Sequence, residues 1–73
     1  MERIVLRNKY NEFLKDIDTQ DGNIEFTNDK KEAKTYKTEW FATVESEYVS
    51  YHFNELGDKV LTLTPCIIYD RNE

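Results

Sequence analysis

The sequence has little cysteine, proline and glycine, and these scarcities exclude several classes of protein. Its one cysteine, Cys66, permits neither an internal disulfide nor a zinc site that needs two or more thiolates from one chain. With one proline and two glycines, it offers no flexible linker and no phosphate-binding glycine loop. We therefore expect one domain over residues 1–73, with no bound metal ion and no cofactor.

The sequence also lacks a long apolar run. No stretch approaches the roughly 18 apolar residues that a membrane-spanning helix needs, and the first ten residues mix charged and apolar side chains. We expect the protein to stay out of membranes and to be cytoplasmic, where a lone thiol remains reduced.

Charge is plentiful but unequally divided between the two halves. The chain carries 15 acidic and 10 basic residues, a net charge of −5. Residues 1–37 hold eight of each sign, whereas residues 38–73 hold seven acids and two bases. A basic surface over the whole domain, which nucleic-acid binding requires, is therefore missing. Nucleic acid is an unfavoured partner.

Three short β-rich runs come first. Residues 3–7 and 12–17 are joined by a polar, Asn-containing connection typical of a hairpin, and residues 24–27 alternate apolar and polar side chains after a turn at Gly22. Asn28 and Asp29 can cap a short helical turn that runs through Lys34 and buries Ala33, and Glu32 has the spacing of a reciprocal capping box.

The longest periodic segment follows Thr38, a second candidate cap. Its apolar residues at helical spacing predict a helix over residues 39–56, ended by Gly57 at the position after the helix. At about 100° per residue, one arc of this helix holds Trp40, Phe41, Val44, Tyr48 and Tyr51. The adjoining arc holds Ala42, Val49, Phe53 and Leu56, and the polar sector holds Thr43, Ser46, Glu47, Ser50 and Asn54. We expect the large rings to lean against a sheet.

An alternative reading of the same segment is a β-hairpin over residues 39–53, because Trp, Phe, Thr, Val and Tyr favour strands. Residues 60–64 and 66–69 alternate and predict a last strand, with Pro65 marking an edge strand, a bulge or a bend. Together these elements predict an α+β fold, in which a small antiparallel sheet, made of a β-meander and a C-terminal strand, packs against one main helix.

Catalytic chemistry finds little support. His52 and Cys66 are the sole histidine and thiol, and Cys66 lies in an apolar strand context typical of an inert thiol. The acidic loop at residues 16–22 has the wrong spacing for a calcium loop. Glu45 and Glu47 are two residues apart, which does not bring them together on a helix. We expect no enzyme activity.

Two groups of charged residues each suggest a possible function. One basic cluster, the alternative for weak nucleic-acid binding, comprises Lys30, Lys31, Lys34 and Lys37. Five acids on or after the helix could instead imitate a track of phosphates and occupy a basic site on another protein: Glu39, Glu45, Glu47, Glu55 and Asp58.

Several short motifs together resemble small uncharacterised proteins encoded by phages and prophages of Gram-positive bacteria. The segments that carry the resemblance are Lys9-Tyr10, Phe26-Thr-Asn-Asp29, Glu32-Ala-Lys34, Tyr36-Lys-Thr38, Leu56-Gly57 and Thr64-Pro-Cys-Ile-Ile-Tyr69. The resemblance implies a β-meander, a threonine-capped helix and a closing strand, in an accessory or host-directed protein. It assigns no functional residue.

The favoured hypothesis is a non-catalytic module that binds another protein. Its candidate contacts, if part of the broad helix face stays exposed and is not all core, are Trp40, Tyr48 and Tyr51, because aromatic side chains dominate many such surfaces, with Glu45 and Glu47 beside them. Self-association into a homodimer through the same helix face is a close relative of this hypothesis.

Overall fold

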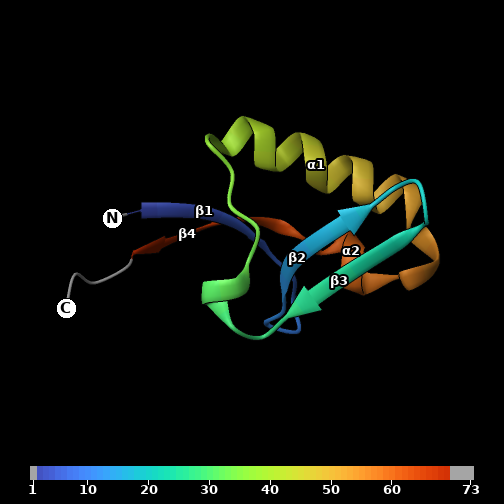
Figure 1. Ribbon diagram of the computed structural model, residues 1–73, viewed down its shortest axis with the longest axis horizontal. Helices are drawn as coiled ribbons and strands as arrows, with labels where there is room; N and C mark the ends of the chain where they lie inside the picture. The colour runs from blue at the N-terminus through green and yellow to red at the C-terminus, as the bar shows by residue number, and fades with distance from the viewer. Residues whose placement is uncertain (1, 70–73) are drawn as a thin grey trace.

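The fold is a sheet with one long helix laid across it (Figure 1). The computed structural model describes residues 2–69; the predicted domain, residues 1–73, also includes Met1 and residues 70–73, which lie outside the described residues. The elements in chain order are β1 (Glu2–Arg7), β2 (Phe13–Asp18), β3 (Asn23–Thr27), η1 (Lys30–Glu32), α1 (Glu39–His52), η2 (Asn54–Leu56), α2 (Asp58–Leu61) and β4 (Thr64–Tyr69).

The sheet has the strand order β3-β2-β1-β4, and every pair of neighbours is antiparallel. The first three strands form the predicted meander, and β4 returns to pair with β1 along its whole length, from Glu2 opposite Tyr69 to Arg7 opposite Thr64. The predicted α+β class, a small antiparallel sheet with one main helix, is therefore confirmed.

Strand β1 is buried on both of its faces. Leu6 belongs to the cluster that packs under α1, together with Ala42 and Val49, whereas Val5 belongs to a second cluster with Phe13 and Ile68. Val5 and Leu6 are both fully buried, which explains the uninterrupted apolar run Ile-Val-Leu in this strand. The second cluster is covered by the segment around η1, through Ala33.

The connection between β1 and β2 is organised by one buried side chain, Asn8. Its Nδ2 donates to Glu12 Oε1 and to the Lys59 carbonyl, both at 3.1 Å, and its Oδ1 accepts from the backbone N–H groups of Tyr10 and Glu12, both at 3.0 Å. Asn11 takes the positive φ of 64° that closes the turn. Asn8 therefore holds the hairpin turn against the segment that carries α2.

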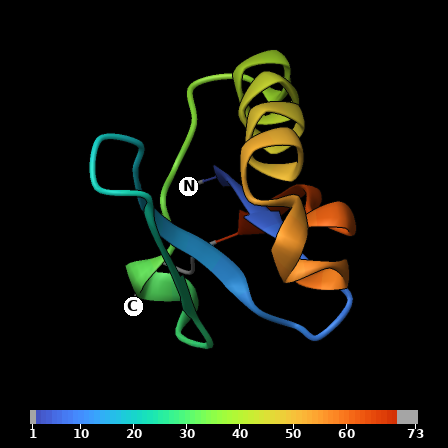
Figure 2. The same ribbon diagram turned by 90° about the vertical axis from the view of Figure 1, so that its right-hand side faces the viewer.

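Strands β1 and β2 pair directly only near their connection, at Arg7 opposite Phe13. Further along, the segment between η1 and α1 joins them: the Lys34 N–H donates to the Leu14 carbonyl of β2 and the Tyr36 N–H to the Ile4 carbonyl of β1, both at 2.9 Å. In the end-on view this segment rises past the β2–β3 hairpin to reach α1 (Figure 2). The hairpin thus diverges from α1, which lies over β1 and β4.

The short turn before this segment agrees with the prediction in part. Asp29 caps η1 by accepting from the Lys31 N–H at 2.9 Å, and Ala33 is buried, both as predicted. The reciprocal capping box is wrong: Glu32 accepts from the Thr27 hydroxyl, and the same hydroxyl accepts from the Asp29 N–H. Thr27 therefore occupies the donor that Glu32 was expected to bind.

Helix α1 begins where predicted and ends earlier. The Thr38 Oγ1 accepts from the Phe41 N–H at 3.2 Å, which confirms the predicted cap and the helical alternative for residues 39–53 over the hairpin. The helix ends at His52, not at residue 56, because Phe53 leaves helical geometry (φ −121°, ψ 32°) while its ring is buried in the core. Gly57 instead closes η2 and precedes α2, at a φ of 64°.

The start of the predicted last strand is wrong. Residues 58–61 form α2, in which Val60 is buried and Leu61 is exposed, and Leu63 is buried three residues after Val60. This spacing fits a helical turn better than a strand. Strand β4 begins at Thr64 and its register with β1 continues through Pro65 without a shift, so Pro65 lies in an edge strand, one of the predicted alternatives, and not in a bulge.

Candidate functional site

The side of α1 that faces away from the sheet is covered by large apolar side chains. Trp40 is 67% exposed, Tyr51 76% and Tyr48 39%, and Phe41 and Val44 are also exposed. We call these five residues, Trp40, Phe41, Val44, Tyr48 and Tyr51, the aromatic stripe. The predicted contacts Trp40, Tyr48 and Tyr51 therefore lie together on one exposed helix side.

The side of α1 that packs on the sheet is built from smaller residues. Ala42, Ser46 and Val49 are its buried positions, and the expectation that the large rings lean against the sheet is wrong. Ser46, assigned to the polar sector, is buried with its hydroxyl donating to the Thr43 carbonyl at 2.8 Å. Small side chains allow a helix to approach a sheet closely, and this approach leaves the bulky rings outside.

An open groove runs beside the aromatic stripe, where the β2–β3 hairpin diverges from α1. Its volume is about 800 Å³. Helix α1, the segment between η1 and α1, and the end of β2 form its walls, which consist of Ile17, Thr19, Lys34, Thr35, Tyr36, Lys37, Phe41, Val44, Glu45 and Tyr48. A smaller hollow of about 190 Å³ shares Thr19 and Tyr48 with the groove and continues toward the end of α1.

A polar network lines part of this groove. Glu45 Oε1 accepts from Lys34 Nζ at 2.6 Å and from the Tyr36 hydroxyl at 2.5 Å. Burial, reinforced by the hydrogen bond to Glu45 and its charge, raises the pKa of Tyr36 well above the ordinary value for a tyrosine. The network ties α1 to the segment that precedes it, and it places three polar side chains among the residues that line the groove.

The two glutamates of the sequence hypothesis have different surroundings. Glu45 turns inward to Lys34 and Tyr36 and is only partly exposed, so it is a structural partner and not a free contact. Glu47 is exposed on the outer side of α1, one residue before Tyr48. Among residues 2–69, no ion pair engages its carboxylate. Glu47 is thus the free negative charge of the aromatic stripe.

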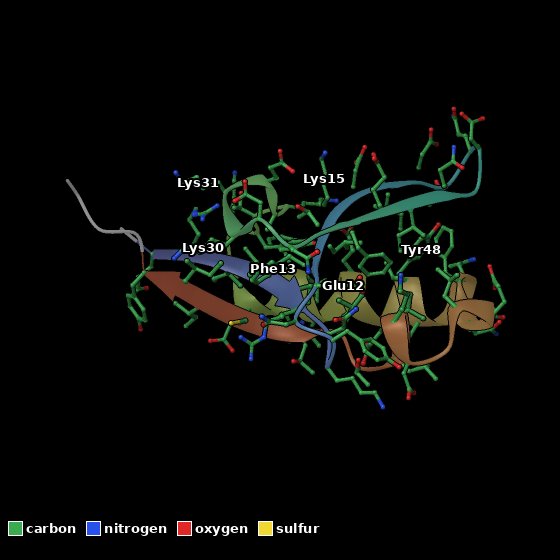
Figure 3. The ribbon with its side chains drawn as sticks, turned by 90° about the horizontal axis from the view of Figure 1, so that it is seen from below. Glu12, Phe13, Lys15, Lys30, Lys31 and Tyr48 are labelled. Carbon is green, nitrogen blue, oxygen red and sulfur yellow. The ribbon has the colours of Figure 1, made fainter. Side chains whose placement is uncertain are left out.

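The four lysines of the predicted basic cluster have different surroundings. Lys30 and Lys31 lie on η1, far along the molecule from Tyr48 (Figure 3). Lys34 is held by Glu45, while Lys37 lies on the rim of the groove with an exposed side chain. Of the four lysines, Lys34 is therefore neutralised within the domain.

The His52 and Cys66 side chains belong to opposite faces of the sheet. His52 is exposed at the end of α1, with its ring 4.2 Å from that of Tyr48 and 5.0 Å from that of Tyr51, centroid to centroid. Cys66 packs with Val5 in the cluster beneath the sheet. Within residues 2–69, no three His, Cys, Asp or Glu side chains are placed to hold a metal ion. No described helix is long and apolar enough to cross a membrane.

Comparisons with family models, with curated proteins and with solved structures found no match. The site therefore has to be interpreted from its own geometry. Sequence reasoning found the aromatic stripe and missed the groove beside it, because Ile17, Thr19 and Tyr36 reach the groove from three separate segments. No periodic pattern in the sequence links those three residues.

Proposed function

We propose that this protein is a non-catalytic module that binds another protein through the aromatic stripe. The observation that carries the proposal is the exposure of five large apolar side chains on one helix side, next to an open groove. A monomeric soluble domain rarely exposes such a contiguous apolar surface without a use for it. Aromatic residues anchor many protein interfaces because they bury large areas at low entropic cost.

The partner that fits this surface is an amphipathic helix with basic residues on its flank. Phe41, Val44, Tyr48 and Tyr51 are spaced by three, four and three residues, the spacing with which two helices pack side by side. Glu47 supplies a free negative charge beside this seam, which favours a lysine or arginine on the partner. The resemblance to phage and prophage proteins implies a partner from the bacterial host.

The imitation of a phosphate track has less support from the geometry. Lys34 pairs with Glu45 at 2.6 Å and Lys9 with Asp58 at 2.8 Å, so two of the five proposed acids are neutralised within the domain. The alternative of nucleic-acid binding through the basic cluster stays a prediction, and salt-dependent retention on DNA or RNA tests it.

Trp40 provides a direct measurement of binding, because it is the only tryptophan and lies on the stripe. We expect its emission to shift to the blue when designed amphipathic helical peptides with a lysine flank are added, and to shift less with peptides that carry glutamate at the same positions. Scrambled peptides of equal composition serve as the control ligand.

Variants locate the contact. Tyr48→Ala together with Tyr51→Ala should weaken peptide binding by about tenfold or more, and Glu47→Lys should reverse the preference for the lysine flank. Tyr10→Ala is the matched control, since Tyr10 is an exposed tyrosine in the β1–β2 turn. Unchanged emission with every peptide, or equal losses in the Tyr10 control, would contradict the proposal.

A further inference from the structure

Strand β4 is an edge of the sheet that carries no charge. Residues 60–69 are the longest stretch of the chain without a charged side chain, and β4 lies within it. Natural edge strands are commonly protected by lysine, by inward charges or by a covering segment, because their unpaired backbone groups can pair with another strand. In β4 only Pro65 provides such protection, at its beginning.

The ladder with β1 fixes which backbone groups of β4 face outward. The Ile4 carbonyl accepts from the Tyr36 N–H on the side of β1 that faces away from β4. Ile67, the partner of Ile4, therefore turns its own N–H and carbonyl away from β1. Pro65 independently supports this alternation. It stands opposite Leu6 in an uninterrupted ladder although it has no N–H to donate to β1, so this position is one whose backbone groups face away from β1. The outward-facing residues are Pro65, Ile67 and Tyr69.

The side chains of these three residues share one face of the sheet. Residues directly opposite each other in a ladder point to the same side, and Ile4 and Leu6 point toward α1. Pro65, Ile67 and Tyr69 therefore lie on the α1 side. Ile67 is 38% exposed and Tyr69 66% exposed. The free edge thus presents both unpaired backbone groups and exposed apolar side chains.

We propose that β4 pairs antiparallel with β4 of a second copy, with Ile67 opposite Ile67 at the two-fold axis. The two Ile67 residues exchange two backbone hydrogen bonds, and each Tyr69 N–H donates to the Pro65 carbonyl of the other copy. Ile67 packs against its counterpart and each Tyr69 ring against the opposite Pro65. The two four-stranded sheets become one sheet of eight strands.

A second copy fits this edge, because Pro65, Ile67 and Tyr69 face outward symmetrically about Ile67 and none of them is charged. Each chain carries a net charge of −5, so two copies repel each other except where the contact has no charge. From β4 itself, a symmetric pairing brings only Pro, Ile and Tyr side chains together on the α1 face. The opposite edge, β3, has Glu25 at its middle, and a symmetric pairing there would set the two Glu25 carboxylates against each other.

Sedimentation velocity at low and high protein concentration tests the proposal. The wild-type chain is expected to sediment as a dimer at the higher concentration. Ile67→Pro removes the outward N–H but leaves the ladder with β1 intact, so it should stay folded by circular dichroism and weaken the dimer roughly 30-fold or more. Ile67→Val keeps the N–H and should retain the dimer. A monomer at every concentration, or a dimer that survives Ile67→Pro, overturns the proposal.

The register has its own test in a Cys66→Ala background. Ile67→Cys places the two thiols at the two-fold axis and should give a disulfide-linked dimer under mild oxidation, because directly opposite residues are within bridging distance. Thr64→Cys is the matched control: the two Thr64 positions of such a dimer are about 20 Å apart along the strands, too far to link. Equal cross-linking at both positions contradicts the register. If instead Trp40→Ala abolishes the dimer and Ile67→Pro leaves it intact, the two copies associate through α1 and the proposal is overturned.

Discussion

The two sides of α1 differ in the size of their side chains as much as in their polarity. The inner side packs on the sheet with Ala42, Ser46 and Val49, while the outer side carries the tryptophan, the phenylalanine and two tyrosines of the aromatic stripe. A hydrophobicity pattern alone favours the outer side as the core. The side of α1 that faces the sheet is the one whose small side chains let the helix approach closely, and not the one with the larger apolar area.

Two valines on the same helix give the largest contrast between its sides. Val49 is fully buried and Val44 is 43% exposed. Val49→Ala should lower the free energy of unfolding by about 2–3 kcal/mol, because it leaves a cavity under α1. Val44→Ala should lower it by less than about 0.5 kcal/mol. Urea unfolding of both variants measures the difference, and equal losses would mean that the helix is turned differently on the sheet.

The network under the stripe should have a smaller, pH-dependent effect. Tyr36→Phe removes the hydroxyl that donates to Glu45 and should lower the free energy of unfolding by about 1 kcal/mol near neutral pH. Because the folded-state pKa of Tyr36 is raised above its unfolded value near 10, this contribution is complete below about pH 10 and decreases as the pH rises toward the folded-state pKa.

Paired unfolding curves of wild type and Tyr36→Phe at pH 8 and at pH 11 check this direction. The difference between the two proteins should shrink at the higher pH. The absorbance titration near 295 nm, taken as wild type minus Tyr36→Phe, isolates the ionisation of this one tyrosine. A step at or below the ordinary tyrosine value would show that the ring is not buried against Glu45 in solution.

The Thr38 side chain caps the first turn of α1. Thr38→Ala removes the acceptor for the Phe41 N–H and should lower the free energy of unfolding by about 1 kcal/mol. Thr38→Ser keeps a hydroxyl at this position and should recover most of the loss. Thermal unfolding followed by circular dichroism distinguishes the two, and a loss in both would assign the effect to the methyl group.

The smallest stability effect is expected on the outer side. Trp40→Ala and Tyr51→Ala should each change the free energy of unfolding by less than about 0.5 kcal/mol, since both rings are mostly exposed. Tyr51→Ala, which keeps Trp40 as the fluorescent reporter, should still weaken peptide binding, so stability and binding separate on this side of α1. A loss of more than about 2 kcal/mol in either would show that the ring is part of the core.

Local signals predicted much of the fold. The strands at β1, β2 and β3, the Asp29 and Thr38 caps and the buried Ala33 follow from residues that are close in sequence. The capping-box error was local, since Thr27 lies two residues before Asp29, but two other errors came where a distant contact decided the structure. Phe53 ends α1 because its ring enters the core, and Val60 belongs to a helical turn because it packs on the cluster beneath α1. No window of neighbouring residues contains either contact.

The same division applies to the candidate site. Trp40, Tyr48 and Tyr51 could be named from helical spacing, which places them on one side of any helix that covers residues 39–52. The inward turn of Glu45 could not, because its partners Lys34 and Tyr36 belong to a segment that reaches it only after pairing with β1 and β2. The groove depends on the same pairing.

The sequence by itself determined the first three strands, the Asp29 and Thr38 caps, the absence of charge in residues 60–69 and the single tryptophan, because these follow from local backbone preferences and composition. The tertiary structure alone decided which side of α1 became core and which edge of the sheet stayed open. Both outcomes depend on how closely elements from distant parts of the chain can approach, and this is settled by the sizes of the side chains that meet between them.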